Sequence, residues 1–136
     1  MNVLIDTSVW SLVFRRNKPQ EKEKKIANAL ISLIQDLRIA IIGPVRQELL
    51  SGISKQAVFD DLKQKMSVFT DSIIQTADYE LAAEYSNICR KHGIQGSHID
   101  FLICAVAVRN GWEIFTEDID FFNYKEYLPI KLYIPR

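Results

Sequence analysis

Short apolar segments alternate with helix-like segments along this chain, and this alternation restricts the folds that the chain can adopt. Four apolar runs have the length and residue types of buried strands, at 2–5, 38–42, 112–115 and 130–134, and a further short strand is expected within 67–75. Parallel neighbours in a sheet need crossover connections, which are usually helical. The sequence therefore predicts an α/β fold, with a mostly parallel central sheet flanked by helices on both faces.

The segments between these runs carry helical patterns. In the clearest of them, Ile26, Leu30 and Leu33 recur at spacings of three and four residues, which places them on one face of a helix. Gly43-Pro44 precedes another helix, because proline suits the first helical turn. The complete set of expected helices comprises one that follows Asp6 and those at 21–37, 45–51, 54–66, 76–92, 97–109 and 118–125.

Length and charge limit the classes of protein that this chain can represent. It has 136 residues, of which 48% are hydrophobic, so we expect one domain over residues 1–136 with an ordinary buried core. Its 17 Lys and Arg balance its 17 Asp and Glu. A net charge of zero argues against attraction to phosphate backbones over the whole surface, so any nucleic acid is expected at a local site.

The first residues and the cysteines indicate a cytoplasmic protein that makes no membrane contact. The chain starts without the basic region of a secretory signal, and no apolar stretch approaches the ~18 residues of a membrane span. Cys104 lies within an apolar run, where a small buried hydrophobic residue fits well. We therefore expect no disulfide between Cys104 and Cys89.

Four acidic residues stand where apolar segments begin or end. Asp6 and Asp118 follow predicted strands, whereas Glu48 and Asp100 lie near the starts of predicted helices. In open α/β sheets, ligands collect outside the carboxyl ends of the strands, so all four side chains can share one edge. Carboxylates gathered in this way are oxygen ligands for a divalent ion such as Mg²⁺.

Each acid also has an explanation that needs no ligand. Residues 97–100 (Ser-His-Ile-Asp) fit a capping-box-like pattern, and Asp6 has the position of an N-cap. Asp118 or Asp120 could cap the next helical turn, and Glu48 could be a solvated surface residue. The joint arrangement favours the metal site, because caps have no need to fall on one sheet edge.

Three other features have simpler explanations. His92 and His98 lack the spacing of a metal-binding pair and are expected at the surface or in caps. The apolar residues 10–14 could face a protein partner, although core packing is the more usual fate of such residues. A small basic cluster that could contact an RNA backbone follows the first acid and consists of Arg15, Arg16 and Lys18.

Four segments together carry a family resemblance. They are 3–10 (Val-Leu-Ile-Asp-Thr-Ser-Val-Trp), 44–52 (Pro-Val-Arg-Gln-Glu-Leu-Leu-Ser-Gly), 97–105 (Ser-His-Ile-Asp-Phe-Leu-Ile-Cys-Ala) and 115–121 (Phe-Thr-Glu-Asp-Ile-Asp-Phe). Each alone is common in α/β proteins, but in this order they span almost the whole chain. The chain resembles PIN-domain ribonucleases and, within them, the VapC toxins of bacterial toxin–antitoxin pairs.

The resemblance implies a PIN-domain fold and an endoribonuclease that hydrolyses RNA phosphodiester bonds with metal-activated water. The positions that match the family's Mg²⁺- or Mn²⁺-binding and catalytic acids are Asp6, Glu48, Asp100 and Asp118. Asp120 matches an often acidic position beside the site. Ser8 stands where many PIN domains carry asparagine, and Thr116 matches a small hydroxyl residue that lies near the metal.

The resemblance also implies partners. VapC-like toxins usually form homodimers and are held inactive by a small VapB-like antitoxin whose tail covers the active groove. The substrate would be RNA. The choice of RNA target depends on surface shape, which no motif in this sequence encodes.

Two other functions are compatible with parts of the pattern. A phosphoacceptor receiver domain would need paired acids after the first strand and a lysine after the last central strand, whereas this chain has Asp6 alone and no lysine near Asp118. The alternative function is a catalytically silent PIN-like module that binds RNA or a protein partner. A nuclease assay with metal titration separates this module from an enzyme.

Overall fold

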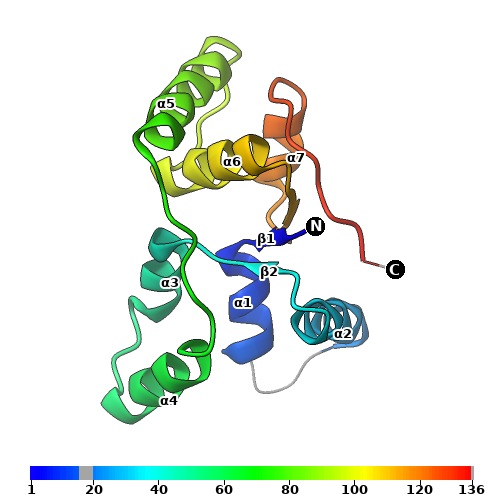
Figure 1. The fold of residues 1–136 in the computed structure, drawn as a ribbon, viewed down its shortest axis with the longest axis vertical. Coiled ribbons are helices and arrows are strands. Elements are labelled where there is room, and N and C mark those ends of the chain that lie inside the picture. The colour runs from blue at the N-terminus through cyan, green and yellow to red at the C-terminus, as the bar shows by residue number, and fades with distance from the viewer. Residues whose placement is uncertain (16–19, 136) are drawn as a thin grey trace.

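The computed structural model describes residues 1–15 and 20–135 of the chain. Arg16 and Lys18, two members of the basic cluster, lie outside the described residues. The described chain contains seven helices arranged around a central sheet (Figure 1).

The sheet has three parallel strands, which are β1 (Val3–Ile5), β2 (Ile39–Ala40) and β3 (Glu113–Phe115). The strand order is β2-β1-β3, so β1 is central. Leu4 pairs with Ala40 on one side and with Ile114 on the other. All residues of β1 are fully buried, because helices cover both faces of the sheet. The predicted α/β fold class is therefore confirmed.

The helices are α1 (Thr7–Phe14), α2 (Glu21–Gln35), α3 (Gly43–Leu50), α4 (Gln56–Met66), α5 (Thr76–Lys91), α6 (His98–Asn110) and α7 (Asp120–Lys125). In Figure 1, α5 and α6 lie above the sheet, and α1 and α2 lie below it. α3 and α4 follow β2 at the side of the molecule. Within the described ranges, no helix combines the length and apolar character that crossing a bilayer requires.

Residues 67–75 form no strand, contrary to the sequence expectation. Arg46 of α3 donates from its guanidinium to the carbonyl oxygens of Met66 and Phe69. It also pairs with Asp71, with Nη2 and Oδ1 3.0 Å apart. Because these contacts satisfy backbone and charged groups, the segment is held in an irregular conformation without a strand ladder.

The expected last strand at 130–134 is reduced to a single parallel bridge between Leu132 and Ile114. Tyr133 N–H donates to the Ile114 carbonyl at 2.8 Å. Pro129 and Pro135 flank this segment, and proline cannot donate to a ladder. The pairing beside β3 therefore stays short.

α6 forms the centre of the core above the sheet. Its residues Phe101 to Ala107 are all buried, and the helix packs between α5 and the strands. A helix that is apolar on every face suits such a position. Cys104 in this stretch and Cys89 of α5 are both free, which confirms that they form no disulfide.

The apolar segment 10–14 packs into the core below the sheet. Trp10 is fully buried, and its ring centroid lies 5.0 Å from that of Phe69 and 5.8 Å from that of Phe14. Leu12 and Val13 pack against the same core. Core packing therefore accounts for Trp10, whereas Leu12, Val13 and Phe14 are packed against the core but stay partly exposed.

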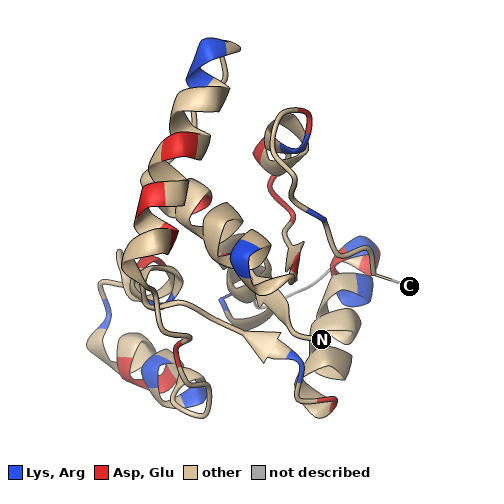
Figure 2. Cartoon of the chain, turned by 45° about the horizontal axis from the view of Figure 1, so that its top comes forward, with Lys and Arg blue, Asp and Glu red and all other residues tan. Residues whose placement is uncertain are grey.

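Opposite charges lie side by side on the outer helices, as Figure 2 shows for α2 and α4. Lys24 pairs with Glu21 at 3.4 Å, and Lys65 pairs with Asp61 at 2.9 Å. Exposed pairs of this kind contribute little to stability. They mark the solvated faces of α2 and α4.

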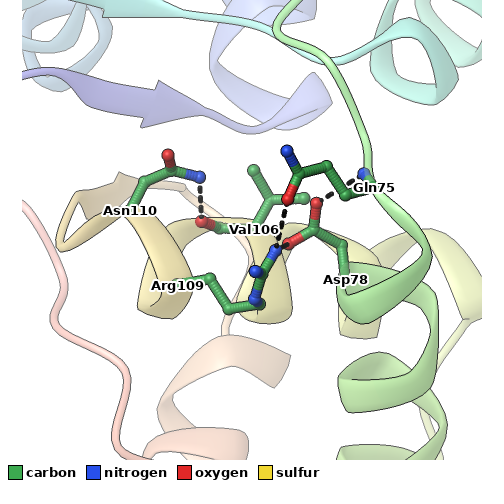
Figure 3. A network of polar contacts seen from close by, with 5 residues as sticks. All are labelled: Gln75, Asp78, Val106, Arg109 and Asn110. Atoms are coloured by element: carbon green, nitrogen blue, oxygen red, sulfur yellow. Dashed lines mark hydrogen bonds and ion pairs between the residues drawn. The ribbon is translucent and has the colours of Figure 1, made fainter.

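An ion pair between a buried carboxylate and a partly exposed guanidinium joins α5 to α6 (Figure 3). Arg109 donates from Nη1 to Oδ1 of Asp78 at 2.7 Å, and Oδ2 of Asp78 accepts the backbone N–H of Gln75 at 2.8 Å. The Asp78 side chain is only 2% exposed. A carboxylate can be buried to this extent because it is both paired and hydrogen-bonded.

Candidate metal centre

The ends of β1 and β3 bring the acidic residues to one cleft. Asp6 directly follows β1, and Asp118 lies in the acidic segment between β3 and α7 (Figure 2). The cleft has a volume of about 510 Å³, and the residues that line it are Asp6, Thr7, Ser8, Ser11, Arg15, Glu48, Ser97, Asp100, Asp118 and Asp120. The structure thus gathers all four predicted acids, with Asp120, at the edge where the sequence places them.

Three of these carboxylates form a tight group. Asp100, Asp118 and Asp120 each offer an oxygen atom, and the three atoms lie within 4.8 Å of one another. Asp6 and Glu48 line the same cleft outside this group. The sequence puts Asp120 at the margin of the site, whereas in the structure Asp120 belongs to the tight group and Asp6 and Glu48 do not.

Asp6 is held by two hydroxyl groups. Its Oδ2 accepts from Ser8 Oγ at 2.7 Å and from Thr116 Oγ1 at 2.8 Å. Asp6 occupies the N-cap position of α1 but forms no capping hydrogen bond through its side chain. Burial raises the pKa of Asp6 above its ordinary value, while the two hydroxyl bonds act in the opposite direction. The carboxylate is thus oriented by its neighbours rather than used as a cap.

The same two hydroxyl groups fix the turn that carries Asp118. Ser8 Oγ accepts the N–H of Glu117 at 3.0 Å, and Thr116 Oγ1 accepts the N–H of Asp118 at 3.0 Å. Asp118 Oδ1 in turn accepts the N–H of Asp120 at 2.9 Å. Each hydroxyl therefore links the end of β1 to the segment after β3, which supports the sequence interpretation of Ser8 and Thr116 as residues close to the acids.

Replacing Thr116 with valine should lower the free energy of unfolding by about 1–3 kcal/mol, because the Asp6 carboxylate and the Asp118 N–H both lose a partner in a buried place. It should also weaken any stabilisation by added Mn²⁺, because Asp118 is no longer held in place. Thermal unfolding with and without Mn²⁺ measures both effects. Thr116→Ser keeps the hydroxyl and should stay close to the native chain; if serine and valine behave alike, the hydroxyl bonds have no such role.

Asp100 accepts a hydrogen bond from a residue that the sequence interpretation missed. Its Oδ2 accepts from Tyr124 Oη at 2.7 Å, while its backbone N–H donates to Ser97 Oγ at 3.1 Å. Ser97 is thus the N-cap that the sequence predicts, whereas the Asp100 carboxylate accepts from Tyr124 rather than from the start of the helix. The only signal for Tyr124 in the sequence is its position four residues after Asp120, which puts the two on one side of a helix.

The charged form of Asp100 is disfavoured in the cleft by burial and by the neighbouring acids. Burial, and to a lesser extent the charges of Asp6 and Asp118, raise the pKa of Asp100 to about 6, although the hydrogen bond from Tyr124 acts in the opposite direction. Burial also raises the pKa of the Tyr124 hydroxyl, which therefore stays protonated and able to donate. A positive charge in the cleft would relieve this repulsion.

Among the described residues, Arg15 lines the cleft, whereas the two histidines lie elsewhere on the surface. Arg15, at the end of α1, is exposed and lines the cleft together with exposed Glu48 of α3. His92 is exposed and stacks on Tyr127 with ring centroids 3.9 Å apart. His98 is the exposed first residue of α6. Neither histidine belongs to the group of carboxylates, as the sequence predicts.

The donor set suits a hard divalent cation. Asp100, Asp118 and Asp120 present only oxygen ligands, which Mg²⁺ and Mn²⁺ prefer, and no histidine or cysteine joins them among the described residues. Burial is the main cause of the raised pKa of Asp100, and the charges of Asp6 and Asp118 add to it, so a cation in the cleft would favour the ionised carboxylate. The residues present therefore fit a metal centre of this class.

Comparisons with known proteins show the fold and the family of this chain. No curated protein sequence matches the chain. Among solved structures, FitAcB from Neisseria gonorrhoeae has a TM-score of 0.77 at 19% identity, over 98% of this chain and 97% of that chain. VapBC2 from Rickettsia felis, bound to a DNA fragment from their promoter, has a TM-score of 0.77 at 20% identity, over 98% of each chain.

A toxin–antitoxin complex from Klebsiella pneumoniae is also similar, with a TM-score of 0.64 at 18% identity over 88% of this chain and 90% of that chain. At such low identity these likenesses show the fold alone. The family is shown by a sequence match to the PIN domain model over residues 3–127, which include every acid of the cleft. The chain belongs to the PIN domain family.

Proposed function

We propose that this chain is a metal-dependent endoribonuclease of the VapC type, which serves as the toxin of a toxin–antitoxin pair. The observation that carries the proposal is the convergence of Asp100, Asp118 and Asp120 in a cleft that Asp6 and Glu48 also line. This convergence occurs in a chain of the PIN domain family. A silent binding module would have no need to hold five carboxylates together against their repulsion.

The acidic residues divide into two roles in this proposal. Asp100, Asp118 and Asp120 would hold Mg²⁺ or Mn²⁺, and Asp6 and Glu48 would complete the acidic lining of the active cleft. When bound, the ion supplies an activated water and a Lewis acid for hydrolysis of an RNA phosphodiester.

Supporting side chains position the acids and the substrate. Ser8 and Thr116 orient Asp6 and the turn that carries Asp118. Arg15, exposed at the same cleft, can bind a phosphate of the RNA backbone through its planar guanidinium.

The similar structures support a protein partner. The Klebsiella pneumoniae structure is a toxin–antitoxin complex, and the Rickettsia felis structure is VapBC2 bound to promoter DNA. By likeness to them we propose a VapB-like antitoxin as the partner. From the resemblance of the sequence to VapC toxins we also propose a homodimer as the toxin assembly, and from the sequence we propose the cytoplasm as the place of action.

The function is tested by incubating the purified chain with cellular RNA in the presence of Mg²⁺ or Mn²⁺. We expect cleavage that stops with EDTA and returns with excess metal, because hydrolysis needs the ion. Sequencing the 5′ ends of the fragments identifies the RNA target. A DNA oligonucleotide with the sequence of the identified cleavage site then tests the preference for RNA over DNA.

Matched variants show whether the acidic cleft is responsible. Asp118→Asn should abolish cleavage, whereas Asp36→Asn makes the same chemical change at the exposed C-cap of α2, outside the cleft, and should leave cleavage intact. Binding of RNA without cleavage under all metal conditions would favour the silent module. Cleavage that survives both EDTA and Asp118→Asn would point to a contaminating nuclease or to a different site.

A further inference from the structure

α7 brings a buried tyrosine hydroxyl to the carboxylate group. Asp120 begins α7 and belongs to the group, and Tyr124 follows one turn later on the same helix. Tyr124 is fully buried, and its Oη donates to Oδ2 of Asp100 on α6 at 2.7 Å. α7 therefore contributes one acid directly and contacts a second acid, Asp100, through Tyr124.

The tyrosine ring is fixed by its neighbours, so its hydroxyl has little freedom. The ring centroid of Tyr124 lies 5.0 Å from that of Phe101 and 5.2 Å from that of Phe121. Both phenylalanines are buried. A donor on an immobile ring restricts the rotation of the carboxyl group that accepts from it.

Gly96 leaves the space that the hydroxyl occupies. A Cβ atom at this position would lie 2.5 Å from Tyr124 Oη and 2.8 Å from Phe101 Cζ, which is closer than non-bonded atoms approach. By contrast, Gly52, Gly93 and Gly111 have positive φ and open space around them. Gly96 is thus required for a steric reason, and it lies directly before the N-cap Ser97 of the helix that carries Asp100.

We propose that Tyr124 is a positioning residue, whose hydroxyl holds the Asp100 carboxylate in the orientation in which it meets Asp118 and Asp120, and that Gly96 makes room for it. This inference rests on the proposed metal-dependent function. Hydrogen-bond partners of metal-binding side chains orient them before the ion arrives, and their loss typically weakens metal binding.

Tyr124→Phe tests the proposal by removing one oxygen atom and keeping the packed ring. The Mn²⁺ dissociation constant, obtained from the rise in melting temperature with added Mn²⁺, should increase by about 10- to 100-fold. The maximal cleavage rate at saturating Mn²⁺ should recover towards the native value, because the ligand Asp100 is still present. Tyr85→Phe, at a buried tyrosine of α5 that does not line the cleft, serves as the matched control and should leave the dissociation constant unchanged.

Gly96→Ala provides a second variant that keeps the hydroxyl but displaces it. It should also weaken Mn²⁺ binding, and the additional effect of Gly96→Ala should be smaller in the Tyr124→Phe background, where Tyr124 Oη, the atom nearest to the added Cβ, is gone and only the contacts with the Phe101 ring remain. Additive effects of the two substitutions on the dissociation constant would contradict the proposed role of Gly96.

The outcomes separate this inference from the proposed function. If the native chain binds Mn²⁺ and cleaves RNA while Tyr124→Phe binds Mn²⁺ equally well, Tyr124 has no positioning role and the proposed function stands. If Tyr124→Phe and Tyr85→Phe weaken Mn²⁺ binding equally, the effect is one of general stability and the inference is also wrong. If the native chain neither binds Mn²⁺ nor cleaves RNA, the proposed function fails, and this inference fails with it.

Discussion

Replacing Asp100 with asparagine is expected to remove RNA cleavage and to raise the melting temperature of the metal-free protein. Cleavage should fall on the order of 100- to 1,000-fold, because a weakened metal centre loses several kcal/mol of transition-state stabilisation. Stability should rise because burial holds the pKa of Asp100 at about 6, so the folded chain carries this charge at neutral pH less easily than the unfolded chain does. Gain of stability with loss of activity is typical of a strained functional site.

The pH dependence of this gain has a definite sign. A carboxyl group with a pKa of about 6 in the folded chain and ~4 in the unfolded chain binds protons more tightly when folded. Its contribution to the free energy of unfolding is therefore most favourable below pH ~4 and declines as the pH rises through about 6. Asparagine does not titrate, so the stabilities of the native chain and the variant should coincide near pH ~4, diverge between pH ~4 and pH ~6, and differ fully above pH ~6.

Calorimetric unfolding of both proteins without metal, between about pH 4 and pH 8, measures the separation. At neutral pH the variant should be more stable by about 1–2 kcal/mol, a value reduced for the partial exposure of Asp100. Asp36→Asn at the exposed end of α2 should show no such pH-dependent difference. An Asp100→Asn variant that melts below the native chain at every pH would mean that Asp100 is a structural residue.

Removing the guanidinium of Arg109 is expected to have the largest effect on stability. Arg109→Met should lower the free energy of unfolding by about 2–4 kcal/mol, because it leaves the nearly inaccessible Asp78 carboxylate without its cation. The contacts of Gln75 and Asp78 with Arg109 in Figure 3 join the start of α5 to the end of α6. Loss of this link should loosen α5 against the helix that carries Asp100. Urea unfolding measures the change.

Two comparisons identify the cause of this loss. The double variant Asp78→Asn with Arg109→Met should recover part of the stability, because the uncompensated charge is gone while an oxygen remains for the Gln75 N–H. Lys24→Met breaks the exposed pair with Glu21 and should cost less than about 0.5 kcal/mol. If Arg109→Met costs no more than Lys24→Met, the buried pair does not stabilise the packing of α5 on α6.

Much of the fold could be predicted because it depends on local patterns. The residues of β1 are consecutive and apolar, as a strand buried on both faces requires, and the turn-forming Asp6-Thr7-Ser8 marks where it ends. The predictions of strands at 67–75 and 130–134 were wrong, because β-rich composition is a local property whereas strand pairing depends on the neighbouring segments. Arg46 holds the first segment by side-chain contacts, and prolines limit the second.

The candidate site could be predicted in its members but not in its internal arrangement. Asp6, Glu48, Asp100 and Asp118 were identified because strand ends and helix starts share one edge of a parallel sheet. Asp120 entered the central group because the Asp118 side chain accepts its N–H and turns the chain at the start of α7. Such distances depend on the turn that Ser8 and Thr116 hold together across 108 residues of sequence.

The amino-acid sequence by itself determined the α/β class, the positions of the helices and which acids meet at the sheet edge, because these follow from hydrophobic spacing and chain order. The family resemblance also came from the sequence, but it rests on the residues of four matching segments. Only the tertiary structure decided which three carboxylates are close enough to share an ion, and that Tyr124 and Gly96 support one of them. The reason is physical: periodicity assigns a residue to an element and a face, whereas a distance of a few ångströms between side chains depends on how separate elements pack.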